Sequence, residues 1–129
     1  MAYTFGTTVE GDIESVRERV TEELGKEGFG ILTTIDVQAT LKAKIDVDRD
    51  PYLILGACNP VLANEAIKLE SDIGALLPCN VVLIQEGDSV SVRFMDPAAV
   101  LGLVDRPEIE SVASQVQAKL KKVAAAITA

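Results

Sequence analysis

The sequence predicts an α+β fold of two layers, with a mainly antiparallel sheet of about five strands and helices packed on one face. Two apolar stretches, Tyr52–Cys58 and Cys79–Glu86, have the composition of central strands. The second leads through Gly87 and Asp88 into an alternating stretch, which is typical of a β-hairpin. Apolar residues at helical spacing elsewhere predict amphipathic helices to cover the sheet.

Length and composition indicate one soluble domain over residues 1–129. A chain of 129 residues with 48% hydrophobic and 25% charged residues is ordinary for a globular domain. Its net charge of -8 argues against nucleic acid or an anionic membrane surface as a partner, because both are bound through Lys and Arg. No apolar run approaches the ~20 residues that cross a bilayer, and no signal peptide is visible.

The absence of histidine limits the chemistry. With no His in the sequence, Ser-His-Asp and Cys-His catalytic sites and histidine-rich zinc sites are excluded within one chain. Two cysteines without a secretory signal are expected to be reduced thiols in a cytoplasmic protein.

The first elements are a strand and a helix. Residues 2–8 alternate and predict a short strand, after which Asp12 is placed to cap a helix that runs to about residue 27. Gly28 suits the end of that helix because glycine tolerates a left-handed backbone. The buried stripe of the helix is predicted to be Ile13, Val16, Val20 and Leu24.

The next segment leaves one alternative open. Residues 29–37 are rich in β-branched residues and predict a strand. Residues 38–45 alternate as a strand would, yet their Ala, Leu and Lys are good helix formers, and we favour a short helix. The acidic residues 46–50 lack the glycine and the final Glu of a calcium loop, so a solvated turn is the better interpretation.

The central stretch, residues 52–86, is predicted to be strand, helix and strand. Asn59 can cap a helix over 61–70, and Pro60 suits its first turn. Residues 71–74 end this helix, and the apolar residues 75–78 must pack against the body of the protein. Pro78 then leads into the second central strand.

The last elements are the hairpin strand over 89–94, a loop or single helical turn over 97–104, and a long helix opened by Asp105-Arg106-Pro107. The stripe of that helix has the three-and-four spacing of a helix that covers a sheet. It consists of Ile109, Val112, Val116, Leu120, Val123 and Ile127.

The two cysteines are the only soft nucleophiles of the chain. If their thiols lie together, Cys58 and Cys79 could form a transient disulfide, carry sulfur or bind a soft metal such as Cu(I). The plainer interpretation is that both are small buried hydrophobic residues at strand ends. Asn59 and Asn80 each follow a cysteine and are expected to act as caps or turn residues, although their amides could orient a ligand.

Strand direction decides between these interpretations. Parallel strands would put Cys58 and Cys79 at opposite ends of the sheet, whereas antiparallel strands would bring both to one end. The connection between them is long enough for either arrangement.

The strings ILGACNP, IDVQATLKAKI and IGALLPCNVV resemble the domain-of-unknown-function 302 family of small bacterial and archaeal proteins. The resemblance covers nearly the whole chain, and the paired cysteine-asparagine motifs are the family's hallmark. It implies a small α+β fold, often a dimer, and no established activity. It also points to Cys58, Asn59, Pro60, Pro78, Cys79 and Asn80 as a shared feature.

Three hypotheses follow, of which the first is favoured. The chain is a small cytoplasmic protein, accessory rather than enzymatic, that binds a small ligand or soft metal near the Cys-Asn motifs. Alternatively it is a thiol-based redox or sulfur-handling enzyme, with Cys58 the better nucleophile because a helix begins after it. The third hypothesis is a structural dimer module without a small-molecule site.

Self-association is also expected. A mean hydropathy of +0.25 gives more apolar surface than two small layers easily hide. A sheet face left open would then pair with a second copy of the chain, so we expect a homodimer.

Overall fold

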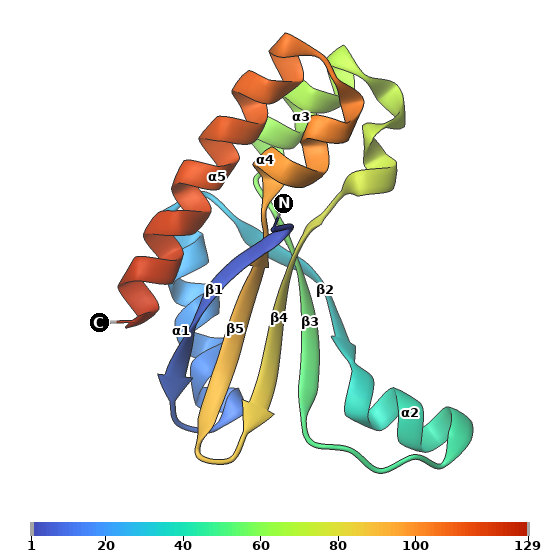
Figure 1. The fold of residues 1–129 in the computed structure, drawn as a ribbon, viewed down its shortest axis with the longest axis vertical. Coiled ribbons are helices and arrows are strands. Elements are labelled where there is room, and N and C mark those ends of the chain that lie inside the picture. The colour runs from blue at the N-terminus through green and yellow to red at the C-terminus, as the bar shows by residue number, and fades with distance from the viewer. Residues whose placement is uncertain (1, 129) are drawn as a thin grey trace.

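The computed structural model describes residues 2–128 as an α+β fold built on one open sheet of five antiparallel strands (Figure 1). The strand order is β1-β5-β4-β3-β2, and every neighbouring pair is antiparallel, as the sequence predicts. The elements are β1 (Thr4–Glu10), α1 (Ile13–Lys26), β2 (Gly30–Asp36), α2 (Val37–Ile45), β3 (Tyr52–Cys58), α3 (Pro60–Leu69), the 3₁₀ helix η1 (Ser71–Leu76), β4 (Cys79–Glu86), β5 (Ser89–Met95), α4 (Pro97–Val100), the 3₁₀ helix η2 (Leu101–Val104) and α5 (Pro107–Thr128).

Helices cover one face of the sheet, which we call the inner face. The long helices α1 and α5 lie along it, while α3 and α4 gather beyond the end of the sheet where β3 finishes (Figure 1). The stripes predicted for α1 and α5 are both buried. They pack against the inner-face side chains of the central strands, among them Leu55, Leu83, Val92 and Phe94, each fully buried. No helix in residues 2–128 is long and apolar enough to cross a membrane.

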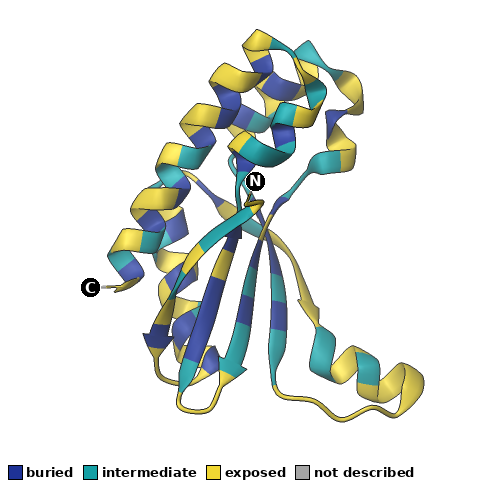
Figure 2. Ribbon diagram, viewed as in Figure 1, coloured by how far each residue is buried: buried dark blue, intermediate teal, exposed yellow. Residues whose placement is uncertain are grey.

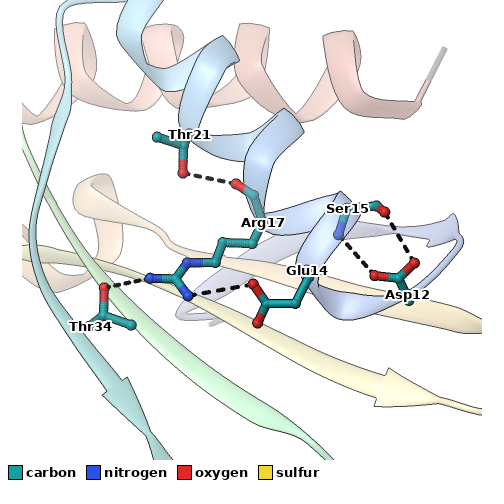
Figure 3. Close-up of polar contacts among 6 residues, drawn as sticks. All are labelled: Asp12, Glu14, Ser15, Arg17, Thr21 and Thr34. Carbon is teal, nitrogen blue, oxygen red and sulfur yellow. Dashed lines mark hydrogen bonds and ion pairs between the residues drawn. The ribbon is translucent and has the colours of Figure 1, made fainter.

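The start of α1 shows how local sequence sets a helix boundary (Figure 3). The Asp12 carboxylate accepts hydrogen bonds from the backbone N–H and the hydroxyl of Ser15, at 3.0 and 3.1 Å. This confirms Asp12 as the predicted N-cap. One turn later, Arg17 donates to the Thr34 hydroxyl at 3.5 Å and pairs with Glu14 at 3.7 Å, so α1 is tied to β2.

The β4–β5 hairpin is held to the start of α1 by one amide. Gly87 adopts a φ of 65° in the tight turn, as the Gly-Asp pair predicts. The Gln85 side chain accepts a hydrogen bond from the Ile13 N–H at 2.8 Å. Its Nε2 donates to the carbonyls of Gly11, Gly87 and Ser89 at 2.9–3.1 Å. The hairpin turn and the first turn of α1 are therefore one connected unit.

Residues 37–45 form the helix α2, the alternative that the sequence favours over a strand. The Asp36 carboxylate accepts a hydrogen bond from the Ala39 N–H at 2.9 Å, which begins the helix, and Asp46 ends it with a φ of 54°. None of its residues is buried, and the helix projects away from the body of the protein (Figures 1 and 2). In the acidic turn that follows, Lys42 pairs with Asp46 and Asp48 at 2.9 and 3.1 Å.

The other face of the sheet, which we call the outer face, has no helix over it among the described residues (Figure 1). The register places Ile35, Ile54 and Val82 in one row across β2, β3 and β4. The same row continues into Arg93 on β5, and Tyr52 lies opposite Ile84 in the next row. An apolar stripe thus crosses the outer face, made of Ile35, Tyr52, Ile54, Val82 and Ile84. Ile35, on the edge strand β2, is 48% exposed.

Candidate functional site at the paired cysteines

Strand direction brings the two cysteines to one end of the sheet. β3 and β4 are antiparallel neighbours, and Cys79 at the start of β4 lies directly opposite Ala57. Cys58 is the next residue of β3 and its last. The question that the sequence leaves open is therefore answered by an antiparallel pair, which brings both cysteines to one end of the sheet. Strand alternation directs the two side chains to opposite faces, Cys79 to the inner face with Ala57 and Cys58 to the outer face.

The chain between the cysteines returns to the same end by way of α3 and η1. Ile73 of η1 is 1% exposed, and Leu69, Leu76 and Leu77 pack against the core. The apolar link expected at residues 75–78 is thus half 3₁₀ helix and half extended chain, and it is packed as predicted. The Leu77–Pro78 peptide bond that precedes Cys79 is cis.

A small cavity of about 30 Å³ lies beneath the cysteines. On this scale a single water needs about 10–15 Å³, so the cavity has room for a guest of one or a few atoms. Both cysteines line it, together with residues of the sheet end, α3, η2 and α5. The remaining lining residues are Phe29, Ala57, Asn59, Leu62, Ala63, Ala66, Leu77, Pro78, Leu101, Val112 and Val116.

The two thiols differ in their exposure. Cys79 is 6% exposed, whereas Cys58 is half-buried. Burial raises the pKa of Cys79 to about 11, and the negative charge of a nearby Cys58 thiolate adds to the effect. Burial also raises the pKa of Cys58. Both side chains are therefore neutral thiols at pH 7, and neither is an activated nucleophile.

The Asn59 amide hydrogen-bonds to the backbone through both its oxygen and its nitrogen. Its Oδ1 accepts a hydrogen bond from the Leu62 N–H at 3.2 Å, which confirms the predicted N-cap of α3. Its Nδ2 donates to the Glu27 carbonyl at 3.3 Å, at the end of α1. Gly28 passes close by with a φ of +84°, and a Cβ there would stand 3.1 Å from Nδ2. Asn59 therefore joins two helix ends, and one of its two amide N–H donors is taken by the Glu27 carbonyl.

The other motif residues are divided between the two faces. Pro60 is exposed at the first position of α3, and Asn80 is exposed, on the face of β4 opposite to Cys79. Pro78 lines the cavity, yet its ring also lies against Gly56, where an added Cβ would stand 2.8 Å from Cγ. Of the six predicted residues, four (Cys58, Asn59, Pro78 and Cys79) border the cavity.

The helices that close the cavity are joined by Arg106. Its guanidinium donates to the Leu69 carbonyl at the end of α3, and it lies 3.9 Å from the carboxylates of both Glu70 and Glu108. Because α3 and α5 both line the cavity, this residue ties together two of its walls.

The lining residues from α3, α5 and η2 could not be assigned to a site from the sequence. Ala66, Leu101 and Val116 are ordinary buried apolar residues, and only the fold shows that they surround one space. Within residues 2–128, no group of three or more His, Cys, Asp or Glu side chains is placed to hold a metal ion.

Comparison with known proteins agrees with this geometry only at the level of fold and family. No curated protein matches the chain. A solved structure described as an uncharacterized conserved DUF302 protein from Bacillus stearothermophilus is 25% identical, with a TM-score of 0.91 over 98% of this chain and 99% of that one. A family model described as a domain of unknown function, DUF302, matches residues 5–127. The chain therefore belongs to the DUF302 family.

Proposed function

We propose that the chain is a small binding protein, accessory rather than enzymatic, whose site is the cavity between the Cys58 and Cys79 ends of β3 and β4. The observation that carries this proposal is that both cysteines line one apolar cavity. The volume of about 30 Å³ favours a guest of one or a few atoms over a metabolite, because pockets for larger ligands measure about 300–1,000 Å³. The polar side-chain groups among the lining residues are the two thiols and the Asn59 amide, which also caps α3.

The thiol chemistry favours binding over catalysis. A redox or sulfur-transfer enzyme needs a thiolate near neutral pH. Burial here raises the pKa of both cysteines and so favours the neutral thiol. We expect iodoacetamide to alkylate Cys58 slowly at pH 7 and Cys79 more slowly still. Rapid alkylation of either residue at pH 7 would favour the enzyme instead.

Xenon tests whether the cavity accepts a guest, because this monatomic gas enters small apolar cavities. We expect amide NMR signals of residues around the cavity, such as Ala63 and Val116, to shift as xenon pressure is raised. Ala66→Val should abolish these shifts by filling the space, since Ala66 is 2% exposed and lines the cavity. Ala113→Val is the matched control, because Ala113 is equally buried but does not line the cavity. Unchanged signals in the wild-type protein would favour the structural module.

We also propose that a homodimer forms through the outer face. The support is the apolar stripe of β2, β3 and β4, which no other described element covers (Figure 2). A second copy offers the same stripe, and a two-fold arrangement is the commonest way to bury a self-complementary surface. The cytoplasm is the compartment we propose, because both cysteines are free.

A further inference from the structure

The helix α2 packs only loosely on its own chain. It is nine residues long, and none of its residues is buried. Its side-chain bonds are local, since Gln38 donates to the Arg49 carbonyl and Lys42 pairs with Asp46 and Asp48. An isolated helix of fewer than about 12–15 residues is marginal in water, and most helices in proteins are stabilised by packing one apolar face. A further surface is therefore needed to stabilise α2.

The apolar residues of α2 form a stripe, which we call the arm stripe. Val37, Leu41 and Ile45 recur every four residues and so share one side of the helix. Val37 and Leu41 are half-buried, while Ile45 is 63% exposed. Among residues 2–128, four of the eight exposed large hydrophobic residues lie between positions 32 and 47. This concentration marks the region of β2 and α2 as a binding surface.

The outer face offers a row that matches the arm stripe in length and in the order of its residues. Ile35, Ile54 and Val82 cross β2, β3 and β4 in one row, and Arg93 continues it on β5. The three apolar residues span ~10 Å at the usual strand spacing. The arm stripe spans about 12 Å at the rise of an α-helix and leads into the acidic residues 46–50. Each surface thus has three apolar residues followed by charge, and the two charges are opposite.

One copy of the chain cannot bring these two surfaces together. No linker separates β2, which ends at Asp36, from α2, which begins at Val37, and α2 projects away from the sheet (Figure 1). Residues 46–51 tie the other end of α2 to β3. A second copy offers both surfaces, and no carboxylate lies in the row, so the net charge of -8 on each chain does not oppose contact there. Pairing of two β2 edges is disfavoured, because a register shift between positions 31 and 33 interrupts that edge.

We propose that the homodimer is built by reciprocal contacts of α2. Each copy packs its arm stripe on the row of Ile35, Ile54 and Val82 in the other, and its acidic turn lies beside Arg93 of the partner subunit. This inference rests on the homodimer proposed above and names the element that covers the outer face. A two-fold axis beside β2 makes the two contacts equivalent. Within residues 2–128 the Arg93 side chain bonds only to the Ser91 hydroxyl, so its charge has no carboxylate partner in its own chain.

Hydrogen–deuterium exchange tests the contact in the wild-type protein. Amides of a short uncovered helix exchange rapidly, whereas those of a covered helix are protected. When the protein concentration is raised through the dimer dissociation constant from sedimentation, exchange in residues 37–45 should slow on the order of 10-fold. Exchange in α3, a helix of ten residues whose Leu62 and Ala66 are buried, should stay the same. Equal exchange of α2 in monomer and dimer would overturn the inference and leave the homodimer standing.

Substitutions in α2 test which side of the helix makes the contact. Ile45→Lys should weaken dimerisation about 10–100-fold, because the dimer loses a buried isoleucine of the arm stripe. Ala43→Lys is the matched control, since Ala43 is exposed and lies on the opposite side of α2 from Leu41 and Ile45. It should dimerise as the wild type does. Equal weakening by both substitutions would overturn the contact through the arm stripe.

A mixture of two variants tests whether the contacts are reciprocal. Ile45→Lys disrupts the arm stripe and Val82→Lys disrupts the row, so both contacts are disrupted in the homodimer of either variant. In a mixed dimer the two substitutions meet in one contact, and the other contact is intact. An equimolar mixture should therefore dimerise on the order of 10-fold more tightly than either variant alone.

Far-UV circular dichroism checks the fold of each variant, and Ile54→Lys replaces Val82→Lys if the latter unfolds. Folded variants that do not recover dimerisation on mixing would overturn the inference, because direct packing of the two outer faces predicts no recovery. A wild-type chain that stays monomeric at every concentration would remove the homodimer together with its α2 contacts. The xenon experiment would still decide separately whether the cavity is a binding site.

Discussion

The two faces of the sheet carry similar residues but are covered differently. Along β3 the inner face presents Leu55, which is fully buried, while the outer face presents Ile54, which is partly exposed. On β5, Phe94 is buried on the inner face, while the preceding residue, Arg93, is exposed on the outer face. Helices α1 and α5 cover the inner face, and no described element covers the outer one (Figure 1). These strands therefore carry apolar residues on both faces, but the described helices cover the inner face alone.

The largest difference between the faces is expected at neighbouring positions of β5. Phe94→Ala should lower the free energy of unfolding by about 3–5 kcal/mol, because it empties the centre of the inner-face core. Arg93→Ala, one residue away, should lower it by only about 1 kcal/mol, because this exposed side chain contributes one hydrogen bond, from its Nε to the Ser91 hydroxyl at 3.1 Å. Urea denaturation of both variants measures the contrast. Equal losses would show that the outer face is packed as tightly as the inner one.

A smaller effect is expected from the buried thiol on the inner face. The pKa of Cys79 in the folded protein is about 11, against 9.0 for a free thiol. The folded state thus keeps a proton that the unfolded state loses, so stability should fall as pH rises from about 9 to 11, and stay unaffected by this group below pH 9. The expected loss is about 2–3 kcal/mol. Urea denaturation across this range measures it, with Cys79→Ala as the control that lacks this component. If the unfolding free energy of Cys79→Ala fell equally steeply with pH, the loss would belong to other titrating groups.

On the outer face we expect the smallest effect on the free energy of unfolding but a large effect on dimer formation. Ile35→Lys should change the unfolding free energy of a monomer by no more than about 0.5 kcal/mol, because the side chain is 48% exposed. It should nevertheless convert the proposed homodimer to a monomer in sedimentation experiments at several protein concentrations. Ile67→Lys is the matched control, since Ile67 is 46% exposed but lies on α3. A wild-type protein that stays monomeric would refute the dimer.

Most of the fold follows from local patterns in the sequence. Asp12 and Asn59 cap the helices they were predicted to cap, and the spacing of apolar residues in α1 and α5 identifies the buried stripes. Residues 37–45 were harder, because strand-like alternation competed with helix propensity. The cap at Asp36, whose carboxylate binds the Ala39 N–H, is the local feature that favours the helix.

The candidate site was only partly accessible from the sequence. The Cys-Asn motifs identify the right end of the sheet, but the direction of β4 depends on how α3 and η1 pack, which no local pattern determines. The cavity is hidden for a similar reason. Its walls are apolar residues such as Leu62, Leu101 and Val112, which look like any other core residues until the three elements that carry them meet.

Gly56 lies between Thr33 on the neighbouring strand and Pro78 at the cavity, and this limits which residues the three positions can hold together. A side chain at this position would strike both the Thr33 hydroxyl of β2 and the ring of Pro78, which is also a wall of the cavity. Any larger residue at 56 therefore requires smaller or displaced neighbours at 33 and 78. We expect these three positions to covary among relatives. A change on the outer face at position 33 or 56 would then be accompanied by a change in the cavity wall at position 78.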